Sequence, residues 1–363
     1  MILTVTLNTA LDITYRTPAL LPGATHRVHE VVERPGGKGL NVARVLAALG
    51  HETVVTGFAG GRTGDVVREL LARREGPEGP ERPEGPERTE RAERTERRDR
   101  RDGGDGRDGS RGRGRSLRPV DALLPIAGAT RRTVALVDAS TGETTQLNEA
   151  GPVVSAAEWT GFLTHYERLL RAGAEAVALC GSLPPGLHVG AYGELVRRAR
   201  AAKVPVLLDT SGEPLRRGVA ARPDLLKPNA EELARLTGSH DPLGATYDAR
   251  RRGAHTVVAS LGPAGLLAVT PEGAWRAAPP GPAHGNPTGA GDSAVAGLLS
   301  GLVERLPWPA RLTRAVALST ATVRAPAAGE FDARVYEELL PRVTVTEVGR
   351  EPEGRTGVSS SGA

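Results

Sequence analysis

Short runs of consecutive apolar residues recur along the chain, and longer amphipathic stretches separate them. The runs have the length of buried strands, which we expect at Ile2–Leu7, Thr53–Gly57, Ala176–Cys180, Val204–Leu208, Leu225–Leu226 and Thr256–Ala259. Such runs are typical of parallel strands covered on both faces. Helices are expected between them, at Leu40–Leu49, Asp65–Arg73, Ala156–Ala172, Tyr192–Ala202, Ala230–Thr237 and Ala294–Leu302. This alternation predicts an α/β fold with a doubly wound central sheet, which binds ligands at the carboxyl ends of its strands.

A second pattern, in which polar and apolar residues alternate, predicts a separate small sheet. Arg132–Asp138 and Glu143–Asn148, joined around Thr141-Gly142, are expected to form a hairpin. Ile13–Thr17 and His26–Glu33 are expected to form another pair. We expect these strands, roughly residues 13–34 and 130–149, to form a β-sheet lid over one end of a single domain that spans residues 1–345.

Residues 75–115 differ from the rest of the chain. An acidic residue recurs at every third position from Glu75 to Asp108, and the segment contains no large apolar residue. It therefore has almost nothing to bury against the entropy of ordering, and glycine is too irregular for a collagen helix. The Arg-Gly pairs at 111–115 admit an RNA-binding interpretation, but no aromatic residue lies among them. The prediction is a disordered low-complexity insertion, with a flexible tail at 349–363.

The composition of the chain excludes several kinds of site and argues against several kinds of partner. Cys180 is the single cysteine in the 363 residues, which excludes an internal disulfide framework and a four-cysteine zinc site. No apolar run approaches the roughly 18 residues of a membrane span, and the first residues lack the features of a signal peptide. The net charge is only +4, and charges balance within 75–115, which argues against nucleic acid as a partner. We expect a cytoplasmic protein with no membrane partner.

The cations are almost all arginine, since lysine occurs only at Lys38, Lys203 and Lys227. In so biased a chain, a retained lysine suggests a position that needs a compact ammonium group. Lys38 and Lys227 lie in segments marked by glycine or proline, which makes them candidate functional residues.

The most informative motif is Asn286-Pro287-Thr288-Gly289-Ala290-Gly291-Asp292-Ser293, directly before a helical run. Small residues at a helix start leave backbone N–H groups open to a ligand, and the helix dipole favours an anion there. Asp292 in the first turn would lie beside this anion hole, where it could accept a proton from an attacking hydroxyl. The alternative is an aspartate that only starts the helix.

Two further motifs contain polar residues and lead into predicted helices. Gly36-Gly37-Lys38-Gly39 leads to Asn41; it is neither a Walker A loop nor a dinucleotide fingerprint, and it fits either close approach of a polar ligand or a tight turn. Lys227-Pro228-Asn229 leads to Glu232, and Asn229 with Glu232 has the spacing of a capping box. The alternative places Glu232 near Mg²⁺ through water and Lys227 near nucleotide phosphates.

Taken together and in this order, the motifs resemble those of the ribokinase-like (PfkB) carbohydrate kinases, and most closely the 1-phosphofructokinase family. The matching segments are Thr4–Asp12, Gly36–Asn41, Thr130-Arg131, Gly181–Gly186, Lys227–Glu232, Ser260–Gly265 and Gly289–Asp292. The resemblance covers about residues 1–74 and 116–340. It implies an α/β domain with a β-sheet lid, often paired with the lid of a second subunit, so a homodimer is expected.

The resemblance also implies roles for individual residues. Asp292 would be the catalytic base, and Gly289, Ala290 and Gly291 the anion hole. The sugar would be held by Asp12, Gly36, Gly37, Lys38 and Asn41. The phosphate already on the sugar would be reached by Arg131 and Ser182, and Arg27 on a lid strand would reach a neighbouring subunit's site. ATP would be bound by Lys227, Asn229, Ser260, Gly262 and Gly265, and Mg²⁺ by Glu232 through water.

Three positions depart from the family's pattern. Thr9 follows Asn8 where proline is usual, Pro287 takes the place of a threonine, and Cys180 stands where serine is common. None removes a charged group. The sequence thus favours ATP-dependent phosphorylation of a ketohexose monophosphate, first fructose 1-phosphate to fructose 1,6-bisphosphate. Tagatose 6-phosphate and fructose 6-phosphate are rival substrates, and a catalytically silent sugar-phosphate sensor is the alternative from another class.

Overall fold

The chain folds around a large central sheet whose middle strands are parallel, as a computed structural model of residues 1–73, 117–325 and 327–349 shows. The order of the main path is β15-β14-β13-β12-β11-β10-β9-β1-β4-β5. The strands are β1 (Ile2–Thr6), β4 (Thr53–Ala59), β5 (Val120–Asp121), β6 (Leu124–Pro125), β9 (Ala176–Cys180), β10 (Val206–Asp209), β11 (Leu225–Leu226), β12 (Thr256–Ser260), β13 (Leu266–Val269), β14 (Ala274–Ala278) and β15 (Thr344–Val348). The predicted parallel strands are confirmed, whereas the antiparallel extension β13–β15 was not predicted.

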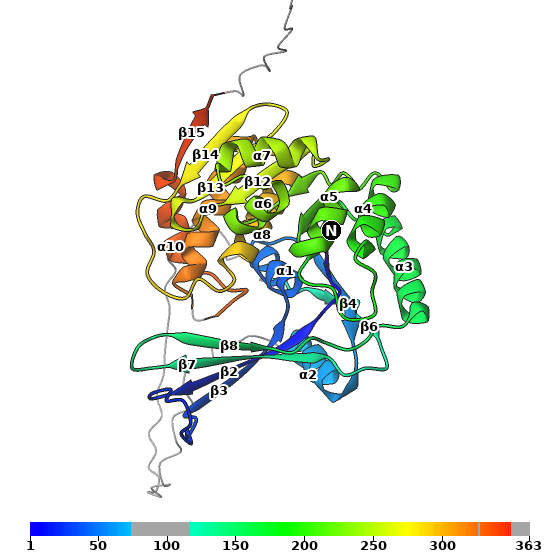
Figure 1. The fold of residues 1–363 in the computed structure, drawn as a ribbon, viewed down its shortest axis with the longest axis vertical. Coiled ribbons are helices and arrows are strands. Elements are labelled where there is room, and N and C mark those ends of the chain that lie inside the picture. The colour runs from blue at the N-terminus through cyan, green and yellow to red at the C-terminus, as the bar shows by residue number, and fades with distance from the viewer. Residues whose placement is uncertain (74–116, 326, 350–363) are drawn as a thin grey trace, which may run out of the picture.

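Helices cover both faces of this sheet (Figure 1). One apolar core lies under α3 (Ala156–Arg171), α4 (Ala191–Ala201), α5 (Gly212–Ala220), α6 (Ala230–Thr237) and α7 (Pro242–Arg251). The other lies under α1 (Lys38–Ala48), α8 (Ala290–Val303) and α9 (Trp308–Val323), with α10 (Ala333–Leu339) nearby. Short 3₁₀ turns are η1 (Gly262–Ala264) and η2 (Leu340–Arg342). The doubly wound α/β fold is therefore confirmed.

A second, four-stranded sheet has the order β3-β2-β7-β8 and lies at one end of the molecule, with α2 (Gly61–Ala72) beside it (Figure 1). Its strands are β2 (Ala10–Thr17), β3 (Glu30–Gly36), β7 (Arg131–Asp138) and β8 (Thr144–Asn148). We call it the small sheet. The hairpin of β7 and β8 was predicted closely, and β2 is longer than expected. The strand predicted from His26 begins only at Glu30, because residues 18–29 form a connecting loop.

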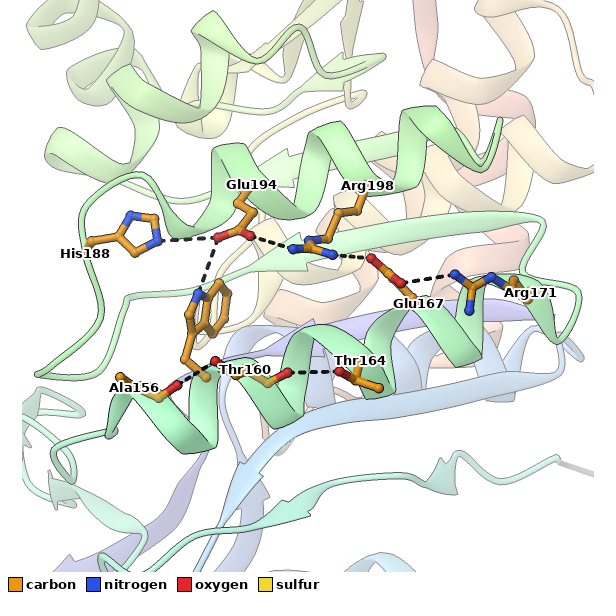
Figure 2. Close-up of polar contacts among 9 residues, drawn as sticks. Ala156, Thr160, Thr164, Glu167, Arg171, His188, Glu194 and Arg198 are labelled. Atoms are coloured by element: carbon orange, nitrogen blue, oxygen red, sulfur yellow. Dashed lines mark hydrogen bonds and ion pairs between the residues drawn. The ribbon is translucent and has the colours of Figure 1, made fainter.

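Polar side chains tie α3 to α4 on the surface (Figure 2). The Trp159 indole donates to Glu194 Oε2 at 3.3 Å. Arg198 bridges Glu194, at 2.8 Å, to Glu167, and Arg171 pairs with Glu167 at 3.0 Å. Ion pairs that remain in contact with solvent each add little to stability, so the apolar layer beneath them carries the packing of these helices.

None of the helices in residues 1–73, 117–325 and 327–349 is long and apolar enough to cross a membrane. The predicted insertion at 75–115 and the predicted tail beyond Gly349 lie outside the described residues.

Candidate active site

The carboxyl ends of the parallel strands meet at the edge of the main sheet that faces the small sheet. β9, β10 and β11 end at or just before Cys180, Asp209 and Lys227, and the loop after β12 follows Ser260. In a doubly wound sheet, this edge is where ligands bind. The motifs selected from the sequence lie along it.

Asp292 occupies the first turn of α8, and its side chain is almost completely buried. Gly289, the N-cap, has φ 85°, a left-handed conformation that glycine adopts without strain. A Cβ at this position would also lie 2.8 Å from Ala328 Cα. Asn41 Nδ2 donates a hydrogen bond to Asp292 Oδ2 at 2.8 Å, which joins α1 to α8 across 251 positions of sequence.

The surroundings of Asp292 make its carboxylate more basic than usual. Burial raises the pKa of Asp292 to about 6, Lys38 lowers it, Asp209 raises it further, and the hydrogen bond from Asn41 lowers it. A carboxyl group with a pKa near the working pH is well matched to accepting a proton in a reaction.

Backbone amides at the start of α8 are partly available. The Ala290 N–H donates to the Pro287 carbonyl at 3.1 Å, so this predicted member of the anion hole is engaged in a turn. Within the described residues, the amides of Gly291 and Asp292 have no hydrogen-bond partner. Lys227 Nζ lies 3.7 Å from where a Cβ on Gly291 would be, which brings an ammonium group to these amides.

Asp209 joins the two lysines that the sequence singled out. Lys38 Nζ lies 3.1 Å from Asp209 Oδ1, and Lys227 Nζ lies 3.6 Å from Oδ2. Burial acts to raise the pKa of Asp209, but Lys227 and Lys38 outweigh it and hold the pKa below its usual value. Asp209 in turn raises the pKa of Lys38 against the opposing effect of burial. The result is a charged cluster of two ammonium groups and two carboxylates, including Asp292.

Asp12 and Gly36 are diagonal neighbours in the β2–β3 pair, because Asp12 pairs with Arg34, two residues before Gly36. Asp12 occupies the space that Gly36 leaves. A Cβ on Gly36 would fall 2.1 Å from Asp12 Oδ1. Burial raises the pKa of Asp12 to about 6, while Arg131, Thr133 and Arg44 lower it. Asp12 and Asn41 line a cavity of about 490 Å³ between the small sheet and the main sheet's loops. This volume is in the range of small-molecule sites.

Arg131 and Ser182 are linked through Asn8. Asn8 Nδ2 donates to Ser182 Oγ at 3.1 Å, and Arg131 Nε donates to the Asn8 carbonyl at 3.1 Å. Arg131 also faces a neighbouring hollow of about 420 Å³ and interacts electrostatically with Asp12. Arg131 therefore lies near both Ser182 and Asp12, on one side of the site.

The residues assigned to ATP lie on the other side. A β-bridge pairs Asn229 with Ser260, and Ser260 N–H donates to the Pro228 carbonyl at 2.9 Å. Asn229 and Glu232 form the capping box that the spacing predicted. Gly262 and Gly265 shape the turn after β12, where Leu261 N–H donates to the Gly265 carbonyl.

The side chains near the site determine how Mg²⁺ could be bound. No group of three His, Cys, Asp or Glu side chains among the described residues could hold a metal ion alone. Glu232 Oε2 accepts from Asn229 N–H, and its other oxygen forms no hydrogen bond or ion pair with a described residue. Magnesium commonly keeps several waters and uses one or two carboxylates together with substrate phosphates. The residues fit that kind of site, with Glu232 as the protein's contributor.

Arg27 was predicted to lie on a lid strand, and this prediction is wrong. It lies exposed in the loop between β2 and β3 rather than on a strand of the small sheet. Lys38 also differs slightly, because it is the first residue of α1 and not part of the preceding loop. The remaining predicted residues lie at the same edge of the molecule.

The three departures from the family's pattern lie beside the site. Thr9 Oγ1 donates to the Thr6 carbonyl, Pro287 accepts from Ala290, and Cys180 is fully buried at the end of β9. Sequence reasoning missed Asp209 and the role of Asn8 as a bridge. The signal that could have identified Asp209 is its position at the end of an apolar run, where the strand reaches the ligand-binding edge of the sheet.

A family model described as pfkB family carbohydrate kinase matches residues 4–75 and 120–333. Phosphofructokinase-2 from Escherichia coli in complex with fructose-6-phosphate is 25% identical, with a TM-score of 0.74, over 94% of this chain and 98% of that one. The tetrameric inhibited form of that enzyme has a TM-score of 0.75 at 25% identity, with the same coverage of 94% and 98%.

A structure described as a possible 1-phosphofructokinase from Thermotoga maritima is 24% identical, with a TM-score of 0.75, over 96% of this chain and 100% of that one, and shares the fold. Sugar kinases of the matched family use ATP, generally with Mg²⁺. Since the family match spans most of the chain on both sides of the 75–115 segment, the chain belongs to the pfkB family of carbohydrate kinases.

Proposed function

We propose that this protein is an ATP-dependent kinase of a ketohexose monophosphate, with fructose 1-phosphate as the substrate and fructose 1,6-bisphosphate as the product. The observation that carries the proposal is the buried carboxyl of Asp292, which lies at the start of α8 and is bonded to Asn41. The fructose-6-phosphate bound by the E. coli relative supports a phosphorylated hexose as the substrate class.

In this proposal, Asp292 accepts the proton of the C6 hydroxyl as that oxygen attacks the γ-phosphorus of ATP. The bond between the γ-phosphorus and the ADP oxygen breaks, and ADP leaves with its electron pair. Asn41 orients the carboxylate through its hydrogen bond. Removing the proton within a fixed geometry lowers the barrier because the attacking oxygen and its base are already positioned.

The transferring group carries negative charge, which the site is arranged to stabilise. The amides of Gly291 and Asp292 belong to the positive end of α8, Lys227 Nζ lies close to Gly291, and Lys38 interacts electrostatically with the Asp292 carboxyl group. Asp209 holds both ammonium groups at this position. Mg²⁺, bound through water to Glu232 and to the nucleotide, would neutralise further phosphate charge.

Asp12, Gly36, Gly37, Lys38 and Asn41 are proposed to bind the sugar, and Arg131 and Ser182 its existing phosphate. Asp12 and Asn41 line one cavity, which supports the assignment of these two residues. Lys227, Asn229, Ser260, Gly262 and Gly265 are proposed to bind ATP. A neutral sugar would not require the cation Arg131 on the acceptor side, which favours a phosphorylated acceptor.

Coupled assays of ADP release with fructose 1-phosphate, tagatose 6-phosphate and fructose 6-phosphate test the substrate. The expected result is the highest kcat/KM with fructose 1-phosphate. A preference for fructose 6-phosphate, as the E. coli neighbour's ligand favours, would correct the substrate and keep the reaction. Binding of a sugar phosphate without turnover of any of the three would replace the kinase with a sensor.

We also propose that two copies pair through the small sheet, with Arg27 reaching the partner's site. Val31 and Leu147 on this sheet are more than half exposed, which supports a covered face in the assembly. Light scattering coupled to gel filtration is expected to give a dimer. A monomer with full activity would contradict the pairing.

A further inference from the structure

Glu330 lies between two arginines from different parts of the fold. Arg34 belongs to β3 of the small sheet, and Arg44 belongs to α1 of the main body. Glu330 Oε1 accepts from Arg34 Nη1 and, at 3.1 Å, from Arg44 Nη2. Hydrogen bonds that join charged groups are about twice as strong as neutral ones, so one carboxylate fastens the small sheet to α1.

Both arginines face the cavity that Asp12 and Asn41 line. Arg34 is paired directly with Asp12 in the β2–β3 register, and residues in such a pair share a face of the sheet. Arg44 follows Asn41 by three positions on α1, so the two lie on neighbouring faces of that helix. The ion pairs of Glu330 therefore lie next to the acceptor side of the site and not next to the nucleotide side.

The segment that carries Glu330 also backs the anion hole. Arg44 Nη1 donates to the Ala328 carbonyl at 3.2 Å. Ala328 Cα lies 2.8 Å from where a Cβ on Gly289 would be, and a Cβ on Gly329 would lie 3.1 Å from Asn41 Oδ1. The same few residues thus contact the small sheet, the helix that holds Asn41 and the start of α8.

We propose that Glu330 is a positioning residue that sets the small sheet, and with it Asp12, relative to Asn41 and Asp292. This inference rests on the proposed function and adds to it a residue that controls how the acceptor sugar is held. Loss of the carboxylate leaves Arg34 without its anchor, so the acceptor side loosens and water gains access to the transferring phosphate. ATP binding, on the other side, is left intact.

Glu330→Gln, Arg34→Met and the double variant are compared with the wild type and with Glu30→Gln. The control removes an ion pair of the same sheet, Arg16–Glu30, whose side chains are exposed. KM for the sugar phosphate is expected to rise about tenfold in Glu330→Gln and Arg34→Met, the factor that corresponds to about 1.4 kcal/mol. KM for ATP stays unchanged, and more ADP is released per sugar product. The double variant is no worse than either single variant, and Glu30→Gln behaves as the wild type.

Hydrogen exchange of the β3 amides gives a readout that does not need activity, and it is expected to quicken in Glu330→Gln and not in Glu30→Gln. Unchanged sugar KM and unchanged exchange in Glu330→Gln would overturn the inference. So would a lowered sugar KM, which would mean that Glu330 repels the acceptor's phosphate, or a parallel change in both KM values with a lowered Tm. An inactive wild type would refute the proposed function instead, and the exchange data would still decide the role of Glu330.

Discussion

Two opposing influences set the pKa of the Asp292 carboxyl group, namely its burial and the charged and polar groups around it. Burial favours its protonated form, while Lys38 and the Asn41 amide favour the carboxylate, and the balance leaves the pKa at about 6. The carboxylate form accepts a proton and the protonated form does not. The rate of a reaction that uses Asp292 as its base must therefore fall as the pH drops through this value.

We expect the pH profile of kcat to bend downward near pH 6, with a tenfold loss per unit below it. Asn41→Ala removes a hydrogen bond that lowers the pKa of Asp292, so the bend should move to higher pH. Steady-state rates from pH 5 to 9 measure both. Asp12 also has a pKa of about 6, but this pKa is set by burial and by Arg131, Thr133 and Arg44 rather than by Asn41. A bend that stays in place in Asn41→Ala would assign it to another group.

Within the β2–β3 pair, the position of the Asp12 side chain depends on Gly36 having no side chain. In Gly36→Ala the new Cβ would meet the Asp12 carboxylate, so Asp12 must move from its position in the cavity. We expect kcat/KM for the sugar phosphate to fall about 100-fold, the loss that a displacement of about 1 Å can cause, with KM for ATP unchanged. Gly161→Ala on α3 is the matched control, because a Cβ there meets open space. Equal kcat/KM for the sugar phosphate in both variants would contradict the assignment of Asp12.

Most elements followed from local pattern, and the exceptions have physical reasons. The parallel strands β1, β4, β9, β10, β11 and β12 were predictable because burial on both faces leaves uninterrupted apolar runs. The two-residue strands β5 and β6, which are mostly exposed, were not predicted. β14 was missed because its sequence, Ala274–Ala278, mixes small, aromatic and charged residues. No helix was predicted over α9, which has Pro309 in its first turn, a position where proline is compatible with a helix.

Candidate site residues could be chosen from the sequence, but the contacts among them could not. Motif order and the retained lysines selected Asp292, Lys38 and Lys227. The pairing of both lysines with Asp209 joins segments that lie far apart in sequence, and no local pattern reports such a contact. The availability of individual amides at Gly289–Gly291 likewise depends on the turn at Pro287.

At the scale of the whole molecule, the family match stops at residue 75 and resumes at 120. Arg118 Nη1 donates to the Ala72 carbonyl at 2.8 Å, so the chain leaves and re-enters the fold at nearly the same place. Replacing residues 75–115 with a short glycine-serine linker is expected to leave kcat, both KM values and Tm nearly unchanged. Thermal unfolding and the coupled assay check this. A large loss in either would show that the segment contributes to the fold or the site.

In the proposed reaction, one buried carboxylate at the start of α8, that of Asp292, removes the proton from a sugar hydroxyl. Asp292→Asn keeps the shape of the side chain and its place beside Asn41 while removing the base. The decisive measurement is kcat for ADP release with the preferred sugar phosphate, together with calorimetric binding of ATP. We expect kcat to fall by about 10³-fold or more while ATP binding changes little. An Asp292→Asn variant that retains kcat within a few fold of the wild type would contradict it.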